Sequence, residues 1–575
     1  MTSFSNSLVE IQRRMDEVGR FLSVALSIAN AHTVEFYTHD VWNRFMAVSP
    51  QDVLSSVSAC NDQQGAPEKR AEERSTTRFG FSSDTNRLID TRELLQAAKS
   101  HSLPGLGVCL SRDELLETLG ESREDTDAEL DPDEFMNSKK SHEVQSMSEV
   151  VACLARHCGA KQVIDVGSGK GYLSSFLSLR YGLQVYGIDS SNTNTHGAQE
   201  RNRKLKKFSK AYQQHEKAAR TRGEAAYSPR GGLSETKPGA TGDRDDGVVS
   251  REEAPIPVAD VETHSEQTAE TEELFLTALS EDVMQTTTPR IPPGKQLSPE
   301  ERERRKRENL EKKARSRSDI GRAVFLPLTS FVTAETELRE LIDELQDAVM
   351  AGLHTCGDLA PSTLRMFVAE PELAAVCSVG CCYHLLSEEF DPAGHESLHG
   401  RAGFPLSRFL RHRSWFCGRN ARMSACLALE RVSVGQGIQM ESLFYRAVFH
   451  VILRDHYGSF KSEKRIGKVY SKANSFVDYV RRGLRKLELD ESKLSDNDVQ
   501  AYHDAYSPRM EEMHAFNMLK VALAPCIEGL ILLDRLCYLK EQEDLSLSAL
   551  VQLFDPLRSP RCYAVVGLKG RRCSS

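Results

Sequence analysis

A glycine-rich segment near residue 165 carries the strongest chemical signal in the sequence. It reads Asp165-Val166-Gly167-Ser168-Gly169-Lys170-Gly171, and it lies between the apolar run 162–164 and a helix-like pattern from Tyr172. Glycines at such a turn let the backbone bend sharply and let a ligand approach the main chain without a Cβ in the way. The next apolar run ends in Asp189, a carboxylate suited to accept hydrogen bonds from two ribose hydroxyls.

The glycine spacing distinguishes between classes of nucleotide cofactor. A dinucleotide fingerprint has Gly-x-Gly-x-x-Gly, whereas here the third glycine falls one residue early. A phosphate-binding P-loop has Lys after its last glycine, but Lys170 precedes Gly171. S-adenosylmethionine fits better, because it has no phosphate, its ammonium suits Asp165 or a nearby acid, and its ribose suits Asp189. The alternative is that this segment is only a turn between strand and helix and binds no ligand. The presence of Asp189 at the end of the next strand disfavours this alternative.

The predicted cofactor-binding residues come from three segments. The helix that leads into the first strand begins near residue 139, where its side chains are placed to cap the ligand. The glycine segment and the end of the next strand supply most of the set, and the fourth predicted strand supplies one histidine. The full set is Lys140, His142, Asp165, Gly167, Ser168, Gly169, Gly171, Asp189, Ser190 and His354.

Polar and reactive side chains follow the fourth and fifth predicted strands, in the segments 352–360 and 379–384. In doubly wound sheets, ligands bind beyond the carboxyl ends of the strands, near the switch in strand order. We therefore expect these side chains beside the reacting methyl group. The candidate catalytic residues are His354, Cys356, Asp358, Cys381, Cys382 and Tyr383.

Three interpretations of this cysteine and histidine group remain open. A metal site lacks a paired C-x-x-C motif, and the adjacent Cys381 and Cys382 point apart if the strand continues, so no metal is predicted. A cysteine nucleophile that attacks a pyrimidine ring needs a thiolate with a lowered pKa. The third interpretation, which we favour, is that the group lines or supports a substrate-binding region. A sulfonium is already a good leaving group, so methyl transfer depends mainly on holding the acceptor in line.

The elements that must position these residues alternate between strand and helix, which predicts an α/β protein with a parallel sheet. The expected strands are 162–166, 184–188, 323–327, 348–353 and 374–380, and an antiparallel pair of strands at 549–554 and 562–568 completes the sheet. Apolar residues spaced by three and four predict a helix from Leu8 to Ala25. Further helices are expected at 41–45, 92–98, 421–431, 470–489 and 526–539.

Composition limits the protein class. The chain has 575 residues, 39% of them hydrophobic, and a net charge of −9, so nothing demands a nucleic-acid partner on electrostatic grounds. Fourteen cysteines are too dilute for a disulfide scaffold and are expected to be reduced. The first twenty residues do not resemble a secretory signal, and no uninterrupted apolar run reaches the ~18 residues of a membrane helix. We expect a cytoplasmic or nuclear protein without a membrane partner.

Several motifs in order resemble the methyltransferase-like protein 25 family. They are 30–33, 135–144, 165–171, 186–191, 352–361, 379–386, 417–423 and 559–563. The resemblance implies a Rossmann-like, seven-stranded class I methyltransferase sheet that binds S-adenosylmethionine. Some relatives are labelled as ribosomal RNA adenine dimethylase-like, but the Asn/Asp-Pro-Pro-Tyr/Phe motif of adenine amine methylation is replaced here by His354-Thr355-Cys356-Gly357.

The resemblance and the pattern together predict the domain organisation. The segments are a helical N-terminal region (1–118), a connector (119–142), two halves of the methyltransferase domain (143–208 and 320–402) around a disordered insertion (209–319), a helical region (403–543) and a terminal β-hairpin (544–575). The leading hypothesis is an S-adenosylmethionine-dependent methyltransferase that acts on RNA or protein. The alternative is a non-catalytic scaffold that keeps the cofactor as a structural ligand. The sequence does not determine the oligomeric state.

Overall fold

The fold is taken from a computed structural model that describes residues 7–62, 79–120, 136–203, 325–396, 401–427, 432, 440–458 and 469–570. The insertion predicted at 209–319 lies outside the described residues, and so does most of the predicted connector.

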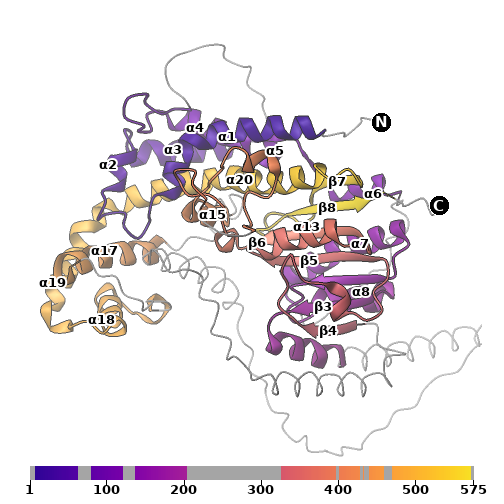
Figure 1. Ribbon diagram of the computed structural model, residues 1–575. Helices are drawn as coiled ribbons and strands as arrows, with labels where there is room; N and C mark the ends of the chain where they lie inside the picture. The colour runs from indigo at the N-terminus through magenta and orange to yellow at the C-terminus, as the bar shows by residue number, and fades with distance from the viewer. Residues whose placement is uncertain are drawn as a thin grey trace, which may run out of the picture.

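A single mixed sheet forms one half of the molecule (Figure 1). Its eight strands have the order β1-β7-β8-β6-β5-β2-β3-β4. The strands are β1 (Cys109–Ser111), β2 (Gln162–Val166), β3 (Gln184–Asp189), β4 (Phe325–Thr329), β5 (Ala348–Cys356), β6 (Leu373–Cys381), β7 (Leu545–Gln552) and β8 (Tyr563–Lys569). The strands from β6 to β4 are parallel, and β8 runs antiparallel to both β6 and β7.

This arrangement confirms the predicted Rossmann-like sheet and its terminal hairpin, but it corrects the number of strands. The seven expected strands are present, and β1 adds an eighth by pairing in parallel with β7. Three residues are too few to show an alternating pattern, so the sequence does not reveal β1. The N-terminal region is therefore not wholly helical, because it contributes the edge of the sheet.

Helices cover both faces of the sheet. On one face, α7 (Ser138–Cys158) and α8 (Tyr172–Tyr181) pack on the central strands, with Val151, Leu154 and Leu177 fully buried. On the other face lie α13 (Leu359–Ala369) and the long α20 (Met510–Lys540). Because both faces are covered, central strands such as β2 are buried along their whole length.

The rest of the molecule is a helical body that runs beside the sheet (Figure 1). Its longest members, α1 (Leu8–Asn30) and α20, lie side by side although they come from opposite ends of the chain. Its other helices among the described residues are α2 (Val41–Phe45), α3 (Pro50–Asp62), α4 (Thr91–His101), α5 (Leu103–Leu106), α14 (Arg408–Arg411), α15 (Arg419–Ser424), α17 (Met440–Tyr457), α18 (Phe476–Leu487) and α19 (Asp496–Tyr506). Two short helices belong with the sheet: α6 (Arg112–Thr118) packs beside β1 and α7, and α12 (Leu338–Leu341) precedes β5.

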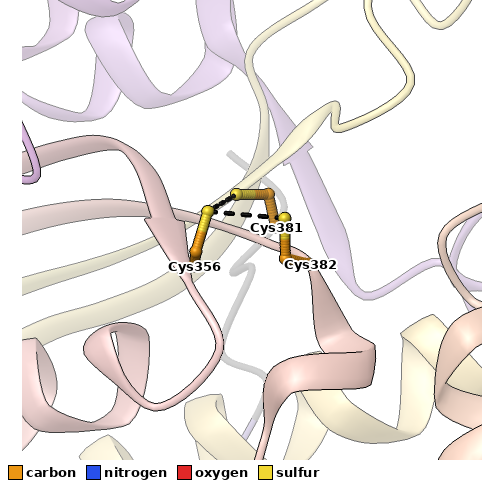
Figure 2. Close-up of side chains that lie close together, drawn as sticks. All are labelled: Cys356, Cys381 and Cys382. Carbon is orange, nitrogen blue, oxygen red and sulfur yellow. Dashed lines mark hydrogen bonds between the residues drawn. The ribbon is translucent and has the colours of Figure 1, made fainter. Parts of the chain in front are cut away.

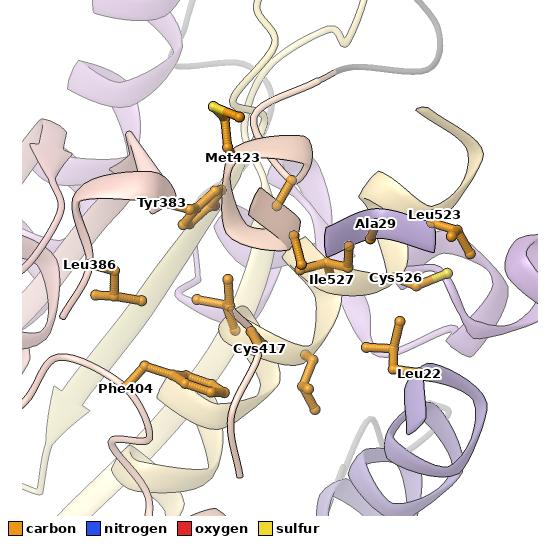
Figure 3. Close-up of a cluster of buried hydrophobic side chains, with 14 of the residues drawn as sticks. Leu22, Ala29, Tyr383, Leu386, Phe404, Cys417, Met423, Leu523, Cys526 and Ile527 are labelled. Atoms are coloured by element: carbon orange, nitrogen blue, oxygen red, sulfur yellow. The ribbon is translucent and has the colours of Figure 1, made fainter. Parts of the chain in front are cut away.

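One apolar core joins this body to the sheet. Figure 3 shows Leu22 and Ala29 of α1 facing Cys526 and Ile527 of α20, with Phe404 nearby, and all five residues are fully buried. The same core continues to residues of β5 and β6. The segments predicted as 1–118 and 403–543 therefore share one hydrophobic interior around α20.

The helical run Asp496–Lys540 is long and apolar enough to cross a membrane by length and composition, with an 18-residue window of mean hydropathy 1.7. The sequence contains no uninterrupted apolar run of that length, so this window is detected only when hydropathy is averaged over the helix. In the fold, 83% of that window is buried inside the molecule, as in a core helix. Length and composition alone therefore do not distinguish α20 from a membrane span.

We expect Asn30→Ala to lower the thermal unfolding midpoint, because Asn30 joins α1 to the segment before α15. Its Nδ2 donates to the Cys417 carbonyl at 2.7 Å, and its Oδ1 accepts from the Ala421 amide at 3.0 Å. Loss of both partners costs about 1–3 kcal/mol. The matched control is Asn43→Ala, whose exposed side chain bonds only to the Asp40 carboxylate. Equal midpoints for the two variants in calorimetry would contradict this docking role.

Candidate functional site

The glycine segment forms the turn between β2 and α8, as predicted. Gly167, Gly169 and Gly171 have φ values of +72°, +54° and +70°, a region that side chains with a Cβ rarely adopt. The Gly169 amide donates a hydrogen bond of 3.0 Å to Asp189 Oδ2 at the end of β3. The turn and the acid therefore come together at the carboxyl edge of the sheet, near the switch in strand order between β2 and β5.

Protein groups already hold the Asp189 carboxylate in place. Besides the Gly169 amide, Oδ1 accepts from the Ser191 amide at 2.8 Å and from Asn194 Nδ2 at 3.1 Å. A carboxylate offers about four acceptor positions, so these three bonds leave room for about one more donor. The expected pair of ribose hydroxyls therefore exceeds what this geometry offers, although one hydroxyl fits.

The three glycines of the turn differ in how much space a side chain would have. A Cβ on Gly171 would lie 2.7 Å from the Phe325 ring, so close packing excludes a side chain there. A Cβ on Gly167 would lie 3.2 Å from Leu359 and 3.4 Å from the His354 carbonyl oxygen. A Cβ on Gly169 would meet no atom of the described chain within 4 Å. The main chain is thus open to an approaching ligand at Gly169.

Ser168 and Ser190, which were predicted to bind the cofactor, have different surroundings. The Ser168 hydroxyl is buried without a hydrogen-bond partner among the described residues. It lies under the turn, where a Cβ on Gly187 would be 3.0 Å from it. Ser190 is exposed, directly after Asp189. The serine that faces solvent at this edge is therefore Ser190, after the end of β3, whereas the hydroxyl of Ser168 in the turn is buried.

Asp165 is buried inside β2, with 1% of its surface exposed. Burial raises the pKa of its carboxyl to about 7. The Ser174 hydroxyl donates a hydrogen bond of 2.5 Å to Asp165 Oδ2, which lowers this pKa and so opposes the effect of burial. The nearby Asp189 charge raises this pKa further, and the Lys140 charge opposes the shift. The side chain therefore changes protonation near neutral pH.

Helix α7 brings Lys140 to His354, as both were predicted to lie at the site. The Asn137 side chain caps the helix by accepting a hydrogen bond of 2.8 Å from the Lys140 amide. Lys140 and Glu143 are three residues apart, so they lie on the same face of this helix. Lys140 Nζ is 3.0 Å from His354 Nε2, and that ring nitrogen is 3.2 Å from Glu143 Oε2. His354 belongs to β5 and is partly exposed.

Glu143 is a buried member of this group that the sequence did not single out as a site residue. Only 1% of it is exposed. Burial raises the pKa of its carboxyl, but the His354 hydrogen bond and the charges of Lys140 and Lys139 outweigh burial and lower it to about 2. The Ser559 hydroxyl donates to Glu143 Oε1 at 2.8 Å. The sequence signal that could have identified Glu143 is its spacing of three and four residues from Lys140 and Lys139, which places all three on the same side of one helix.

His142 faces the β7–β8 turn instead of the glycine segment. Its Nε2 accepts from the Asp555 amide at 3.0 Å, and its ring meets the Phe554 ring edge-on at 5.9 Å. Burial lowers the pKa of its imidazole. The contacts give His142 a role in docking the terminal hairpin, and they do not place it beside Asp189 or Gly169.

The thiols of Cys356, Cys381 and Cys382 converge at the ends of β5 and β6 (Figure 2). Cys356 Sγ is 2.9 Å from Cys381 Sγ and 3.4 Å from Cys382 Sγ. Cys381 and Cys382 were expected to point apart only if the strand continued, and that condition is not met, because β6 ends at Cys381 and Cys382 is left-handed with φ +47°. The hydrogen bonds that Cys356 shares with Cys381 and Cys382 lower the pKa of the Cys356 thiol, and the bond between Cys356 and Cys381 raises the pKa of the Cys381 thiol.

The other two candidate catalytic residues have structural contacts. Tyr383 is 1% exposed, and its hydroxyl donates to Glu528 Oε1 at 2.8 Å (its ring is shown in Figure 3). Asp358 Oδ1 accepts from the Ser387 amide at 2.8 Å and so fixes the segment after β6. Neither side chain reaches the glycine turn in these contacts, so both support the shape of the site.

An exposed aromatic residue at the same edge was missed by sequence reasoning. Phe331 follows β4 and is 77% exposed. The Ser330 amide donates to the Asp189 carbonyl at 3.0 Å, which ties this segment to the end of β3. A lone phenylalanine after a strand gives no distinctive sequence signal.

Comparison with known proteins agrees with this geometry. A family model described as a methyltransferase domain matches residues 139–389, which include the glycine turn, Asp189 and the three cysteines. The chain is 47% identical over 582 residues to the Mus musculus protein named probable methyltransferase-like protein 25, across 96% of this chain and 95% of that protein. The chain belongs to the methyltransferase-like protein 25 family.

A second relative from this family supports the same assignment. The Homo sapiens protein with the same name is 46% identical over 596 residues, across 98% of each chain. No solved structure matches this chain. The resemblance seen in the sequence motifs is therefore confirmed, and it extends over the helical body as well as the methyltransferase domain.

We expect Asp165→Asn to change how stability depends on pH. Below about pH 4, the Asp165 carboxyl is protonated in both the folded and the unfolded protein. Between about pH 4 and about pH 7 it ionises only in the unfolded protein, so the stability of the wild type falls as the pH rises through this range. The full shift corresponds to ~4 kcal/mol. Thermal midpoints from about pH 5 to about pH 8 should therefore rise for the variant relative to wild type. Exposed Asp347→Asn is the control, and parallel curves for all three proteins would refute the raised pKa.

We expect Glu143→Gln to destabilise the fold by about 3 kcal/mol, because it removes a buried charge from its partners. The control is Glu149→Gln on the same helix, where a partly exposed carboxylate lies 3.1 Å from Arg112 and contributes about 0–1 kcal/mol. Thermal unfolding compares the two variants. Equal losses of stability in the two variants would contradict the prediction that the buried Glu143 charge contributes more than the Glu149 charge.

Proposed function

We propose that this protein is an S-adenosylmethionine-dependent methyltransferase. The observation that carries the proposal is the bond between the Gly169 amide and Asp189, beside main chain that is open at Gly169. This pairing of a glycine turn with an acid on the next strand suits a nucleoside. The glycine spacing, which differs from the dinucleotide fingerprint, favours a nucleoside without a pyrophosphate. Membership of a family whose named relatives are probable methyltransferases supports it.

The residues around the turn fit the parts of this cofactor. The remaining acceptor position of Asp189 suits a ribose hydroxyl, and the exposed ring of Phe331 offers an apolar face to adenine. Asp165, below the turn, adds negative character on the side where the cofactor's ammonium is expected. These roles use side chains that already meet at one edge of the sheet.

S-adenosylmethionine supplies a methyl group on a sulfonium, which is a good leaving group. The chain then has to bind the cofactor, exclude water and hold an acceptor in line, so it needs little acid–base help. His354, whose backbone carbonyl lies against Gly167 and whose ring lies next to Lys140 and Glu143, is the side chain we propose for orienting an acceptor. The acceptor class we propose is RNA or protein, and the chain lacks the motif for adenine amines.

We expect Gly169→Arg to abolish binding of S-adenosylmethionine in calorimetric titration, because the side chain would fill the approach to the turn. The control is Gly159→Arg at the end of α7, where φ is +71° and a Cβ would likewise meet no atom within 4 Å. Both variants carry the same backbone cost, so only the position differs. Equal affinity in the two variants would refute the proposed site.

Transfer of a labelled methyl group to components of a cell extract completes this test. Transfer by wild type and by Gly159→Arg, with none by Gly169→Arg, is the expected result. Cofactor binding without transfer to RNA or protein would favour the scaffold alternative over catalysis.

A further inference from the structure

The three converging thiols at the ends of β5 and β6 are not needed for cofactor binding as proposed above. The sulfur atoms of Cys356, Cys381 and Cys382 all lie within 4.8 Å of one another. Figure 2 shows the three side chains pointing toward one another. Cys356 is exposed, Cys382 is partly buried and Cys381 is buried, so the group opens from the interior toward solvent.

Two backbone features produce this convergence. Cys356 and Cys381 are paired neighbours in the parallel ladder of β5 and β6, so their side chains emerge on the same face. Cys382 would then point to the opposite face, but its left-handed backbone turns it back toward Cys356. A positive φ is uncommon for a residue with a Cβ and is often retained at functional sites.

Three thiol sulfurs in one place suit a soft metal ion. Zn²⁺ binds thiolate sulfur at about 2.3 Å, so three sulfurs of a tetrahedral site lie ~3.8 Å apart. Cys356 Sγ lies 2.9 and 3.4 Å from the other two sulfur atoms, and all three lie within 4.8 Å of one another. Side-chain rotation that moves each sulfur by less than ~1 Å therefore brings the group to the spacing of a zinc site.

Positive charge lies near the group. The Arg561 guanidinium acts electrostatically on the Cys356 sulfur, and the buried Arg535 guanidinium acts on Cys381. A Zn²⁺ ion with three thiolates carries a net negative charge, which these cations offset. Arg535 also closes the interior side, since a Cβ on Gly380 would lie almost on its guanidinium.

We propose that Cys356, Cys381 and Cys382 bind a Zn²⁺ ion through their three sulfurs and leave its fourth coordination position open on the exposed side. A site with three protein ligands and one open position is the arrangement of catalytic zinc, whereas structural zinc has four protein ligands. The open position takes water or a soft donor atom from an incoming molecule. This inference does not rest on the proposed methyltransferase activity.

The test measures metal content on the full chain, purified with reductant and without chelator. We expect about one zinc ion per chain by mass spectrometry of the metal. Co²⁺ exchanged into the site should give the visible absorption bands of tetrahedral thiolate coordination. Cys356→Ser and Cys382→Ser should each lower the zinc affinity at least tenfold and weaken the bands, because each removes one thiolate.

The matched control is Cys158→Ser, which removes a partly buried thiol at the end of α7 and should keep the zinc. Circular dichroism and thermal unfolding show whether each variant is folded, and only folded variants are compared. Zinc that survives in Cys356→Ser and Cys382→Ser would overturn the proposal. A wild-type chain that takes up no zinc, or whose mass shows a Cys356–Cys381 disulfide under reductant, would overturn it as well.

Discussion

The candidate site depends on the compensation of one buried carboxylate. Glu143 is almost fully buried, and an ion in that position is tolerated only where charges and hydrogen bonds replace its lost hydration. The compensation comes from Lys140 on the same helix, His354 on β5 and Ser559 in the terminal turn. Three segments far apart in the chain are thereby held at the edge of the sheet where the glycine turn lies. The start of α7 is consequently part of the site rather than a connector.

Two buried acids at this edge behave in opposite ways because their partners differ. Asp165 has a neutral hydroxyl donor and a neighbouring carboxylate, so burial raises its pKa to about 7. Glu143 has cationic neighbours, and these lower its pKa to about 2 despite similar burial. The site therefore combines a carboxyl group whose pKa is lowered with one whose pKa is raised toward neutrality. A cationic ligand above Asp165 favours the ionised form of that acid, so binding and protonation are coupled there.

The helical body packs against the segments that follow β5 and β6. Glu528 of α20 accepts from the Tyr383 hydroxyl directly after the cysteine pair, and Arg535 of the same helix packs against Gly380 on β6. Asp534 holds the segment at residues 406–407 through three hydrogen bonds. Helix α20 in turn packs on α1, so the first helix of the chain braces the segment that shapes the ends of β5 and β6.

The sequence by itself determined the parallel sheet, the terminal hairpin, the glycine turn and its partner Asp189, because each depends on local pattern or on residues that adjacent strands bring together. It missed β1, whose three residues carry no period, and it missed Glu143, whose importance comes from His354 and Ser559 far along the chain. It also left open whether Cys381 and Cys382 point apart, since the direction of the second side chain depends on where the strand ends and on a left-handed residue that the pattern of a strand does not reveal. Only the tertiary structure decided which polar groups meet inside the fold, because burial and partner charge, rather than residue type, set their contacts and their protonation.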